Sequence, residues 1–468
     1  MSKRIVINPL TRISGFMEID VLIEQNKIVD AKTKGNLFRG FEQMLIDRSP
    51  FDAVYFTQRI CGICSAAHSM ASSLALENAL KIKPNEQGIY LRDIIHACEF
   101  LQNHIRHFYQ YTVPDFVKIE QTTILQADHD DFRLPKEINN RISKNYFDSL
   151  SISRLAHQML AVLGGKAPHN HGVFIGGVTT KATAEKVVLL DANLQKITAF
   201  INEEMIPDVY DIAKYYPEYF QLGGGYGNLL SYGSFNHYED LGTLYVDPFV
   251  KMNDRIEVFD ETNIQEKIDY SWFKAPENTY KPDSIVPVPD MDKKEAYSWV
   301  KAPRYNHLPF EVGPLARLIL CGAYPNRVSA MDRTIARALE TKKITEIIST
   351  LLKQIIPDVD VQQKYEIPES ASGKGLVDTT RGALGHWLKI KDKKISFYQI
   401  ITPSTWDFST RDENGNRGVA EEALVGTPIQ NPDQPVEIGR ILRSFDPCMS
   451  CATHVYRPGK QVKTIKVL

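Results

Sequence analysis

The sequence contains the motif Cys-x-x-Cys twice, once near each end of the chain. Cys61 and Cys64 form the first pair in "QRICGICSAAH", and Cys448 and Cys451 form the second in "DPCMSCATH". Such a pair lets two thiolates from one turn reach a single metal ion, and two pairs supply the four sulfur ligands of a tetrahedral site. If the pairs act together, the fold must bring both ends of the chain to one place. This favours one large domain over a string of separate ones.

The spacing of the cysteines alone leaves the chemistry open. Structural zinc, a catalytic or redox metal centre and a thiol redox pair all use Cys-x-x-Cys. Zinc pairs usually lie about 15–20 residues apart, whereas nearly the whole chain separates these two. Two thiol redox pairs in one chain would be unusual. The other cysteines, Cys98 and Cys321, stand in apolar stretches and are expected to be ordinary buried residues.

Composition places the chain among globular proteins with a sizeable core. It has 468 residues, of which 43% are hydrophobic and 24% charged. The net charge of −2 gives no electrostatic basis for binding nucleic acid or an acidic membrane. The N-terminus lacks the apolar run of a signal peptide, and no apolar stretch approaches the roughly 20 residues that cross a bilayer. We therefore expect any membrane contact to come only through partners.

The hydropathy pattern predicts an α+β fold with a mainly helical domain, a helical bundle as its core, N-terminal strands and peripheral hairpins. Residues 4–38 have the alternation of strands around a turn at residues 25–27. Residues 216–310 predict short strands, and "GGGYG" within them predicts a loop rather than a phosphate-binding turn. Helices are predicted at 65–80, 88–111, 145–163, 182–214 and 329–355, and a hairpin turning at Asp392-Lys393 is predicted for 386–401.

Several sequence blocks, taken with the cysteine motifs, resemble the large catalytic subunit of nickel–iron hydrogenases. Between residues 8 and 454 they follow the family's order: "PLTRISGFMEID", "GNLFRGFEQML", "GGKAPHNHGVFIGGV", "KAPRYNHLPFEVGPLAR", "RGALGHW" and "PSTWDFSTRD". The resemblance implies one domain over residues 1–468, with 455–468 as a tail removed during maturation. It also implies reversible heterolytic cleavage of H₂ into protons and electrons, and it favours H₂ uptake.

By this resemblance the four cysteines hold a nickel–iron centre. All four would bind nickel, and Cys64 and Cys451 would also bridge to an iron that carries CO and two cyanides. His68 lies four residues after Cys64, on the same helical face, and could hydrogen-bond its sulfur. Without the family motif, a lone histidine there would more often be structural.

The resemblance also assigns residues around the metals. Arg381 would overhang them and bind cyanide beside Asp446, because a buried guanidinium needs a carboxylate partner. Leu384 and Ser404 would complete the ligand pocket. Glu42 and His454 match the family's Mg²⁺ ligands, together with a backbone carbonyl near residue 400 or 401, and such oxygen-rich ligation suits that ion.

The chain departs from the family pattern around the expected site. Ser14 stands where the family usually has the glutamate that first accepts the proton, and a serine cannot act as a base near neutral pH. Glu18 lies nearby in sequence but does not align. Asn103 replaces a frequent aspartate, and Thr380 a frequent proline. We expect these changes to alter rates or redox behaviour rather than to prevent metal binding.

Two bulky residues stand at positions that the family associates with gas access. Ile63 and Tyr111 are typical there of slow, oxygen-tolerant, hydrogen-sensing members. A regulatory H₂-sensing subunit with weak turnover is therefore the alternative, although sensors of the family usually lack the C-terminal tail. A non-catalytic relative, like the quinone-side subunit of respiratory complex I, would have lost the cysteines that this chain keeps.

The chain needs partners for such a reaction. No spare cysteines remain for iron–sulfur clusters, so a small subunit carrying them is implied as the electron acceptor. The resemblance further implies a maturation protease and nickel-insertion proteins. We expect a prokaryotic enzyme placed at the membrane or on the periplasmic side through its small subunit, with a cytoplasmic location as the alternative.

Overall fold

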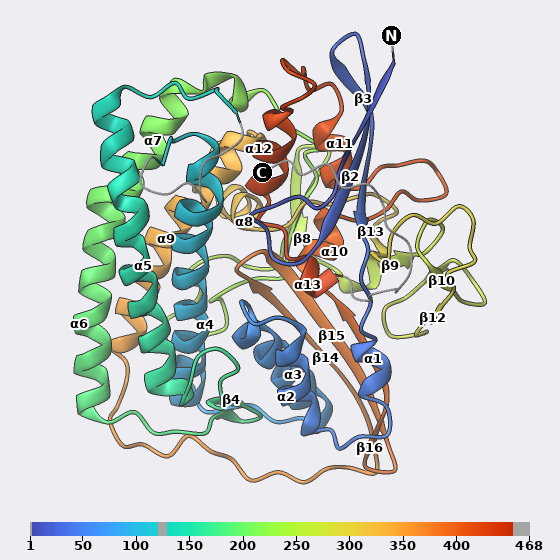
Figure 1. The fold of residues 1–468 in the computed structure, drawn as a ribbon. Helices are drawn as coiled ribbons and strands as arrows, with labels where there is room; N and C mark the ends of the chain where they lie inside the picture. The colour runs from blue at the N-terminus through green and yellow to red at the C-terminus, as the bar shows by residue number, and fades with distance from the viewer. Residues whose placement is uncertain (1, 120–128, 453–468) are drawn as a thin grey trace.

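A computed structural model describes residues 2–119 and 129–452 of the chain. Figure 1 shows a bundle of helices on one side, a long three-stranded sheet beside it, and smaller sheets at the far side. The red C-terminal helices lie in the middle of the molecule, close to the blue N-terminal strands. The predicted α+β class, with a helical bundle as its core, is confirmed.

The N-terminal residues form an antiparallel sheet in the order β1 (Lys3–Ile7), β2 (Met17–Glu24) and β3 (Lys27–Gly35). Alternate residues of β2 are buried, as expected of strands with one face on the core. Gln25 and Asn26 form the turn with φ values of 49° and 59°. The strands and the turn lie where the sequence predicts them.

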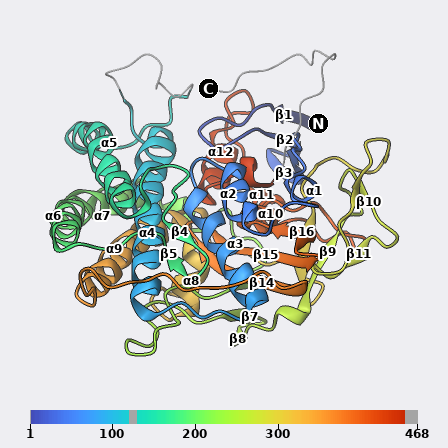
Figure 2. The same ribbon diagram turned by 90° about the horizontal axis from the view of Figure 1, so that it is seen from below.

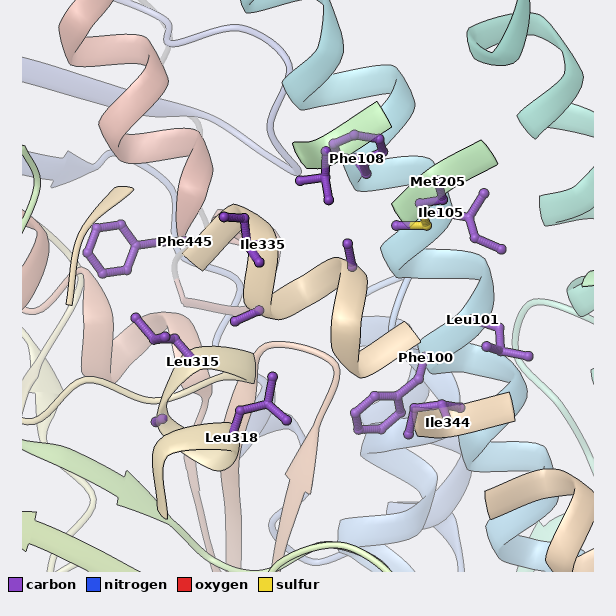
Figure 3. Close-up of a cluster of buried hydrophobic side chains, with 14 of the residues drawn as sticks. Phe100, Leu101, Ile105, Phe108, Met205, Leu315, Leu318, Ile335, Ile344 and Phe445 are labelled. Carbon is purple, nitrogen blue, oxygen red and sulfur yellow. The ribbon is translucent and has the colours of Figure 1, made fainter. Parts of the chain in front are cut away.

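The bundle consists of long helices that share one hydrophobic core: α4 (Glu86–Arg106), α5 (Lys136–Gly164), α6 (Ala184–Phe200), α7 (Ile206–Tyr215) and α9 (Ala330–Leu352). Figure 3 shows Phe100 of α4 beside Ile344 of α9, and Ile105 of α4 beside Met205; all four belong to one buried cluster. The short helix α8 (Pro314–Leu320) closes this core from below with Leu315 and Leu318.

The predicted helices are present, with two differences. Helix α5 begins at Lys136 rather than at 145, because its first turns are largely polar and carry little apolar periodicity. The segment predicted as one helix over 182–214 is interrupted by a short π-helix, η4 (Ile201–Met205). A second π-helix, η2 (His107–Thr112), continues α4. Such bulges insert a residue without ending the helix, so hydropathy does not reveal them.

Helix α3 (Ser65–Leu80), which begins directly after Cys64, lies across the sheet β14 (Ser370–Thr379), β15 (Gly382–Lys391) and β16 (Lys394–Ile401). Figure 2 shows this packing from below. Two glycines of β14 permit it: a Cβ on Gly375 would lie 2.0 Å from the carbonyl oxygen of Ala71. The predicted hairpin of β15 and β16 is confirmed, whereas β14 is not among the predicted strands.

The remaining elements are short. Residues 229–305 form small antiparallel sheets, as predicted, and "GGGYG" is a loop. The short helices are α1 (Phe41–Met44), α2 (Asp52–Thr57), α10 (Pro403–Asp407), α11 (Val419–Leu424), α12 (Val436–Ser444) and α13 (Met449–Ala452). The short strands are β4 (Val173–Phe174), β5 (Gly177–Val178), β6 (Leu229–Ser231), β7 (Phe249–Met252), β8 (Arg255–Val258), β9 (Ile264–Lys267), β10 (Phe273–Lys274), β11 (Thr279–Tyr280), β12 (Val288–Pro289) and β13 (Ala302–Tyr305).

The two isolated cysteines differ in their surroundings. Cys98 is buried in α4, as expected. The expectation for Cys321 is wrong, because this residue is exposed where α8 ends and the chain turns through solvent. Within the two described ranges, no helix has both the length and the hydropathy needed to cross a membrane.

Candidate metal centre

The fold brings the two cysteine pairs from opposite ends of the chain together. Their four sulfur atoms all lie within 4.8 Å of one another. The Sγ–Sγ distances are 3.4 Å between Cys61 and Cys448, 3.3 Å between Cys64 and Cys451, and 2.9 Å between Cys448 and Cys451. Three of the four side chains are buried. The four sulfur atoms therefore surround a single point, as the ligands of a multi-thiolate metal site must.

Backbone pairing holds the two chain ends in register at the cluster. Cys64 is the residue immediately before α3, and α13 carries Cys451. Ser14 forms a parallel β-bridge with Cys448. Its carbonyl oxygen accepts a hydrogen bond from the Met449 amide at 2.7 Å, and its amide donates to the Pro447 carbonyl at 3.2 Å. The second cysteine pair is thereby fixed to the N-terminal segment of the chain.

Cys61, Cys64 and Cys451 have pKa values shifted in different directions. Hydrogen bonding, first of all with the Cys448 sulfur, lowers the pKa of Cys61 well below its ordinary value. The same kind of contact raises the pKa of Cys64, and burial raises that of Cys451. The cluster therefore favours a mixture of thiolate and thiol, and thiolate is the form that binds a metal ion.

Three buried side chains, those of Arg381, Asp446 and Asn103, form a hydrogen-bonded triad over the cysteines. Arg381 donates from Nε to the backbone oxygen of Asp446 at 2.8 Å and from Nη2 to its Oδ1 at 3.1 Å. Asn103 accepts from Arg381 Nη2 at 2.8 Å and donates to Asp446 Oδ2 at 2.7 Å. Burial opposes ionisation of Asp446, but the Arg381 charge holds the pKa of its carboxyl below the ordinary range.

One donor of this triad has no partner among the residues that the structure describes. Arg381 Nη1 is buried and makes no hydrogen bond within the described part of the chain. Arg381 lines a small pocket that also contains two of the predicted residues, Leu384 and Ser404, and three of the cysteines. A buried, unpaired donor is costly. The pocket therefore fits a small polar or anionic ligand held beside the sulfurs.

Ser404 and His68 line the same pocket but bond elsewhere. The Ser404 hydroxyl accepts a hydrogen bond from the Cys448 amide at 2.9 Å. His68 Nδ1 lies 3.2 Å from Nε2 of His386, whose Nδ1 lies 2.8 Å from the Tyr398 hydroxyl. Burial lowers the pKa of His68 to about 4, so its imidazole is neutral near pH 7. The sequence alone indicates no role for His386 or Tyr398, although "RGALGHW" contains the former.

Ser14 is the polar side chain beside Cys448 on the N-terminal side. Its hydroxyl oxygen lies 3.6 Å from the Cys448 sulfur. Glu18 instead contacts Asn8 at 2.6 Å and Lys34 at 2.7 Å on the N-terminal sheet. The structure thus brings Ser14, and not Glu18, into hydrogen-bonding distance of the cluster.

A second pocket, of about 50 Å³, lies on the other side of Cys451 and is lined by Glu42, Lys301 and Ile400. Next to Ile400, the side-chain oxygen of Gln399 is buried without a hydrogen-bond partner among the described residues. The Glu42 carboxylate in this pocket is the kind of oxygen ligand that a hard cation such as Mg²⁺ prefers. Glu42 and Ile400 both line this pocket, whereas His454 and the tail lie outside the described residues.

The sequence matches the family described as nickel-dependent hydrogenase over residues 39–131, 126–327 and 323–454. The chain belongs to this family. It is 37% identical to the periplasmic [NiFeSe] hydrogenase large subunit of Desulfomicrobium baculatum, over 97% of this chain and 95% of that one. It is 30% identical to the hydrogenase-2 large chain of Escherichia coli, with full coverage of both.

Solved hydrogenase structures share the fold. The structure of the H₂-activated Dm. baculatum [NiFeSe]-hydrogenase superimposes with a TM-score of 0.94 at 36% identity, covering 97% of this chain and 100% of that one. The Ni-Fe-Se hydrogenase of D. vulgaris Hildenborough gives a TM-score of 0.93 at 37% identity. The names of these hydrogenases include selenium, whereas all four clustered residues of this chain are cysteines.

These findings confirm the function that the motifs predict. The chain is the catalytic large subunit of a nickel–iron hydrogenase, an oxidoreductase with H₂ as substrate, and its cysteine cluster is the place for the nickel–iron centre. A large subunit implies a small-subunit partner. Nothing in the comparisons favours the H₂-sensing alternative.

Proposed function

We propose that this hydrogenase works as an uptake enzyme, with its nickel bound by Cys61, Cys64, Cys448 and Cys451. In this proposal Cys64 and Cys451 would also help to hold an iron that carries CO and two cyanides. The observation that carries it is the convergence of four sulfur atoms within 4.8 Å beneath Arg381. The Nη1 of this arginine has no hydrogen-bond partner within the described ranges. When bound, the metal pair supplies heterolytic cleavage of H₂ into protons and electrons. A relative named as an uptake hydrogenase, from Rhizobium leguminosarum, supports the direction.

The residues over the cysteines would hold the iron's small ligands. Arg381 would offer to a cyanide nitrogen its Nη1, which has no partner among the described residues, while Asp446 and Asn103 fix the guanidinium. Leu384 gives the pocket an apolar wall, and Ser404 fixes the Cys448 amide. An apolar, water-poor pocket strengthens these electrostatic contacts.

Proton transfer would begin at Cys448 and Ser14. A serine hydroxyl can accept one proton only while it donates another, so Ser14 passes protons along a chain of hydrogen bonds rather than storing them. The 3.6 Å distance between Ser14 Oγ and Cys448 Sγ supports this first step.

We further propose a Mg²⁺ site formed by Glu42, His454 and a backbone carbonyl at residue 400 or 401. Residues 1–468 would form one domain whose tail, residues 455–468, is removed by a maturation protease after nickel-insertion proteins have loaded the site. The electrons would pass to a small subunit with iron–sulfur clusters. A periplasmic relative supports a prokaryotic location on the periplasmic side, with membrane contact only through partners.

An infrared spectrum of the natively purified complex tests the metal centre. We expect one CO and two cyanide stretches, together with H₂-dependent dye reduction. The variant Cys451→Ser should lose both signals, whereas Cys321→Ser, which changes an exposed cysteine away from the cluster, should keep them. A protein that lacks these bands and holds zinc instead would overturn the proposal.

A further inference from the structure

One arginine outside the pocket binds both cysteine loops at once. Arg39 lies between β3 and α1, and its Nη1 donates to the carbonyl oxygen of Arg59 at 3.1 Å. Its Nη2 donates to the carbonyl oxygen of Ile60 and, at 2.9 Å, to that of Ser450. Ile60 directly precedes Cys61, and Ser450 directly precedes Cys451. A single side chain therefore connects two loops whose bound residues, Ile60 and Ser450, are 390 positions apart in sequence.

The chemistry of these contacts requires an arginine. Three carbonyl oxygens from two loops are bound by one planar group, which offers five N–H donors in a fixed fork. The ammonium group of a lysine is a compact point charge on a flexible stem, so it cannot reproduce this arrangement.

The segment around Arg39 holds the guanidinium in position. Gly40 has a φ of 68°, a left-handed conformation that turns the chain into α1. Phe38 stacks on Trp299 with ring centroids 4.9 Å apart. The Arg39 guanidinium lies over the Phe41 ring, 4.7 Å from its centroid. The side chains on both sides of Arg39 are thereby held in place, which limits the conformational freedom of the Arg39 side chain itself.

The guanidinium also places a positive charge near the sulfurs. Burial lowers the pKa of Arg39 from its ordinary value, and the charges of Cys451, Cys61 and Cys448 oppose that effect. A cation near thiolates stabilises their negative charge and reduces the electron density that they donate. Arg39 is therefore suited to influence the electronic state of a metal that these sulfurs bind.

We propose that Arg39 is a positioning residue that joins the two cysteine loops into one ligand set and adjusts the charge on its sulfurs. The inference rests on the proposed assignment of the four cysteines as metal ligands. It adds a role for a side chain that does not itself touch the metals. It also separates two effects that can be measured independently, the mechanical connection of the loops and the positive charge.

Three variants of the full chain, purified with its partner, test the proposal. Arg39→Met removes both the fork and the charge, and Arg39→Lys keeps the charge alone. Arg48→Met is the matched control, because Arg48 is an exposed arginine that bonds the Met44 carbonyl and packs on Phe56. The readouts are hydrogen exchange of residues 58–64 and 446–452, nickel retention against a chelator, and the infrared stretches of CO and cyanide.

We expect faster exchange in both segments for the two Arg39 variants, and nickel retention about tenfold weaker for Arg39→Met. The stretches should move to lower wavenumber in Arg39→Met, because the sulfurs then donate more electron density, and should return towards the wild-type values in Arg39→Lys. Exchange, nickel retention and spectra equal to those of Arg48→Met would overturn the proposal. A wild-type protein without nickel and without the stretches would overturn the proposed function instead. The hydrogen-exchange comparison would still decide whether Arg39 connects the two loops, since this measurement needs no metal.

Discussion

At the scale of single residues, Asn103 shows how a neutral side chain can be matched to charged neighbours. Its amide donates to Asp446 and its carbonyl oxygen accepts from Arg381, so one side chain serves an anion and a cation. An aspartate offers only acceptors when ionised. The departure from the family's frequent aspartate is therefore consistent with the hydrogen bonds of this particular site.

The variant Asn103→Asp is predicted to destabilise the protein. It would place two carboxylates against each other in a buried pocket and leave Asp446 Oδ2 without its donor. Loss of a buried hydrogen bond of this kind costs about 1–3 kcal/mol. The measurement is thermal unfolding of the purified complex at pH 7, with Asn202→Asp on the bundle surface as control. An unfolding midpoint equal to that of the wild type would contradict the prediction.

Ile63 and Tyr111 are expected to restrict gas access. The Ile63 carbonyl accepts a hydrogen bond from the α4 residue Gln102 at 3.0 Å, and the Tyr111 ring packs edge-on against His107. Replacing Ile63 with Val and Tyr111 with Leu removes bulk at both positions. We predict faster inhibition by CO and O₂, measured as inactivation rates in a film or stopped-flow assay. Unchanged rates in the double variant would refute the hypothesis.

At the scale of elements, periodicity in the sequence predicts most of the structure. Helices α3, α4 and α9 are found close to their predicted positions. Helix α4 carries apolar residues at helical spacing, and Pro84 marks the end of the region predicted for α3. Strand β14 escaped prediction because its sequence, "SASGKGLVDT", is rich in small and polar residues. Its glycines are needed for close packing under α3, and that requirement is tertiary. A pattern in the local sequence therefore does not reveal this strand.

The contact between β14 and α3 leads to a second structural prediction. A methyl group on Gly375 would meet the backbone of α3 at 2.0 Å, so Gly375→Ala must push away the helix that follows Cys64. Overpacking of this kind costs about 1–3 kcal/mol or more. We expect a lower unfolding midpoint and less bound nickel. Gly224→Ala is the control, since its added methyl would meet nothing closer than 3.5 Å.

Helix α11 is joined to β3 by a buried carboxyl. Glu421 accepts hydrogen bonds from the Thr33 amide at 3.0 Å and the Tyr297 hydroxyl at 2.9 Å. Burial, which outweighs these bonds, raises the pKa of Glu421 from 4.5 to about 7. At pH values between 4.5 and about 7, Glu421 keeps its proton in the folded protein but releases it in the unfolded chain. The contribution of Glu421 to stability is therefore lost as the pH rises from about 4.5 to about 7.

The variant Glu421→Gln should remove this pH dependence. The difference in unfolding free energy between wild type and variant is expected to change by at most about 1.4 kcal/mol per pH unit across that window and to be constant above it. Unfolding midpoints of both proteins measured from pH 4.5 to 8 provide the comparison. Curves that run parallel across the whole range would show that Glu421 does not titrate in this way.

At the scale of the whole molecule, the metal centre depends on contacts between distant parts of the chain. The cysteines and the triad residues could be identified from short motifs. Arg39, His386 and Tyr398 could not be assigned roles in this way, because their partners come from segments far away in sequence. Nor could the exposure of Cys321 be predicted, since it depends on where α8 ends and not on the apolar residues before it.

Because the ligands come from both chain ends, metal removal should loosen the C-terminal segment in particular. A ligand that binds only the folded form stabilises it in proportion to its affinity. We predict that the nickel-free protein has a lower unfolding midpoint and is cleaved faster by protease near residues 446–452 than the loaded protein. Equal cleavage of both forms would show that the backbone bridge at Ser14 is sufficient to hold this segment.

The separation of the cysteine pairs also sets an order of events during synthesis. Cys64 and Cys451 are 387 residues apart, and at roughly 5–20 residues per second a ribosome needs about 20–80 s to pass from one to the other. During that time the nascent chain contains only the first cysteine pair, which is half of the four sulfur ligands. Nickel can therefore be enclosed only after translation of the chain is essentially complete.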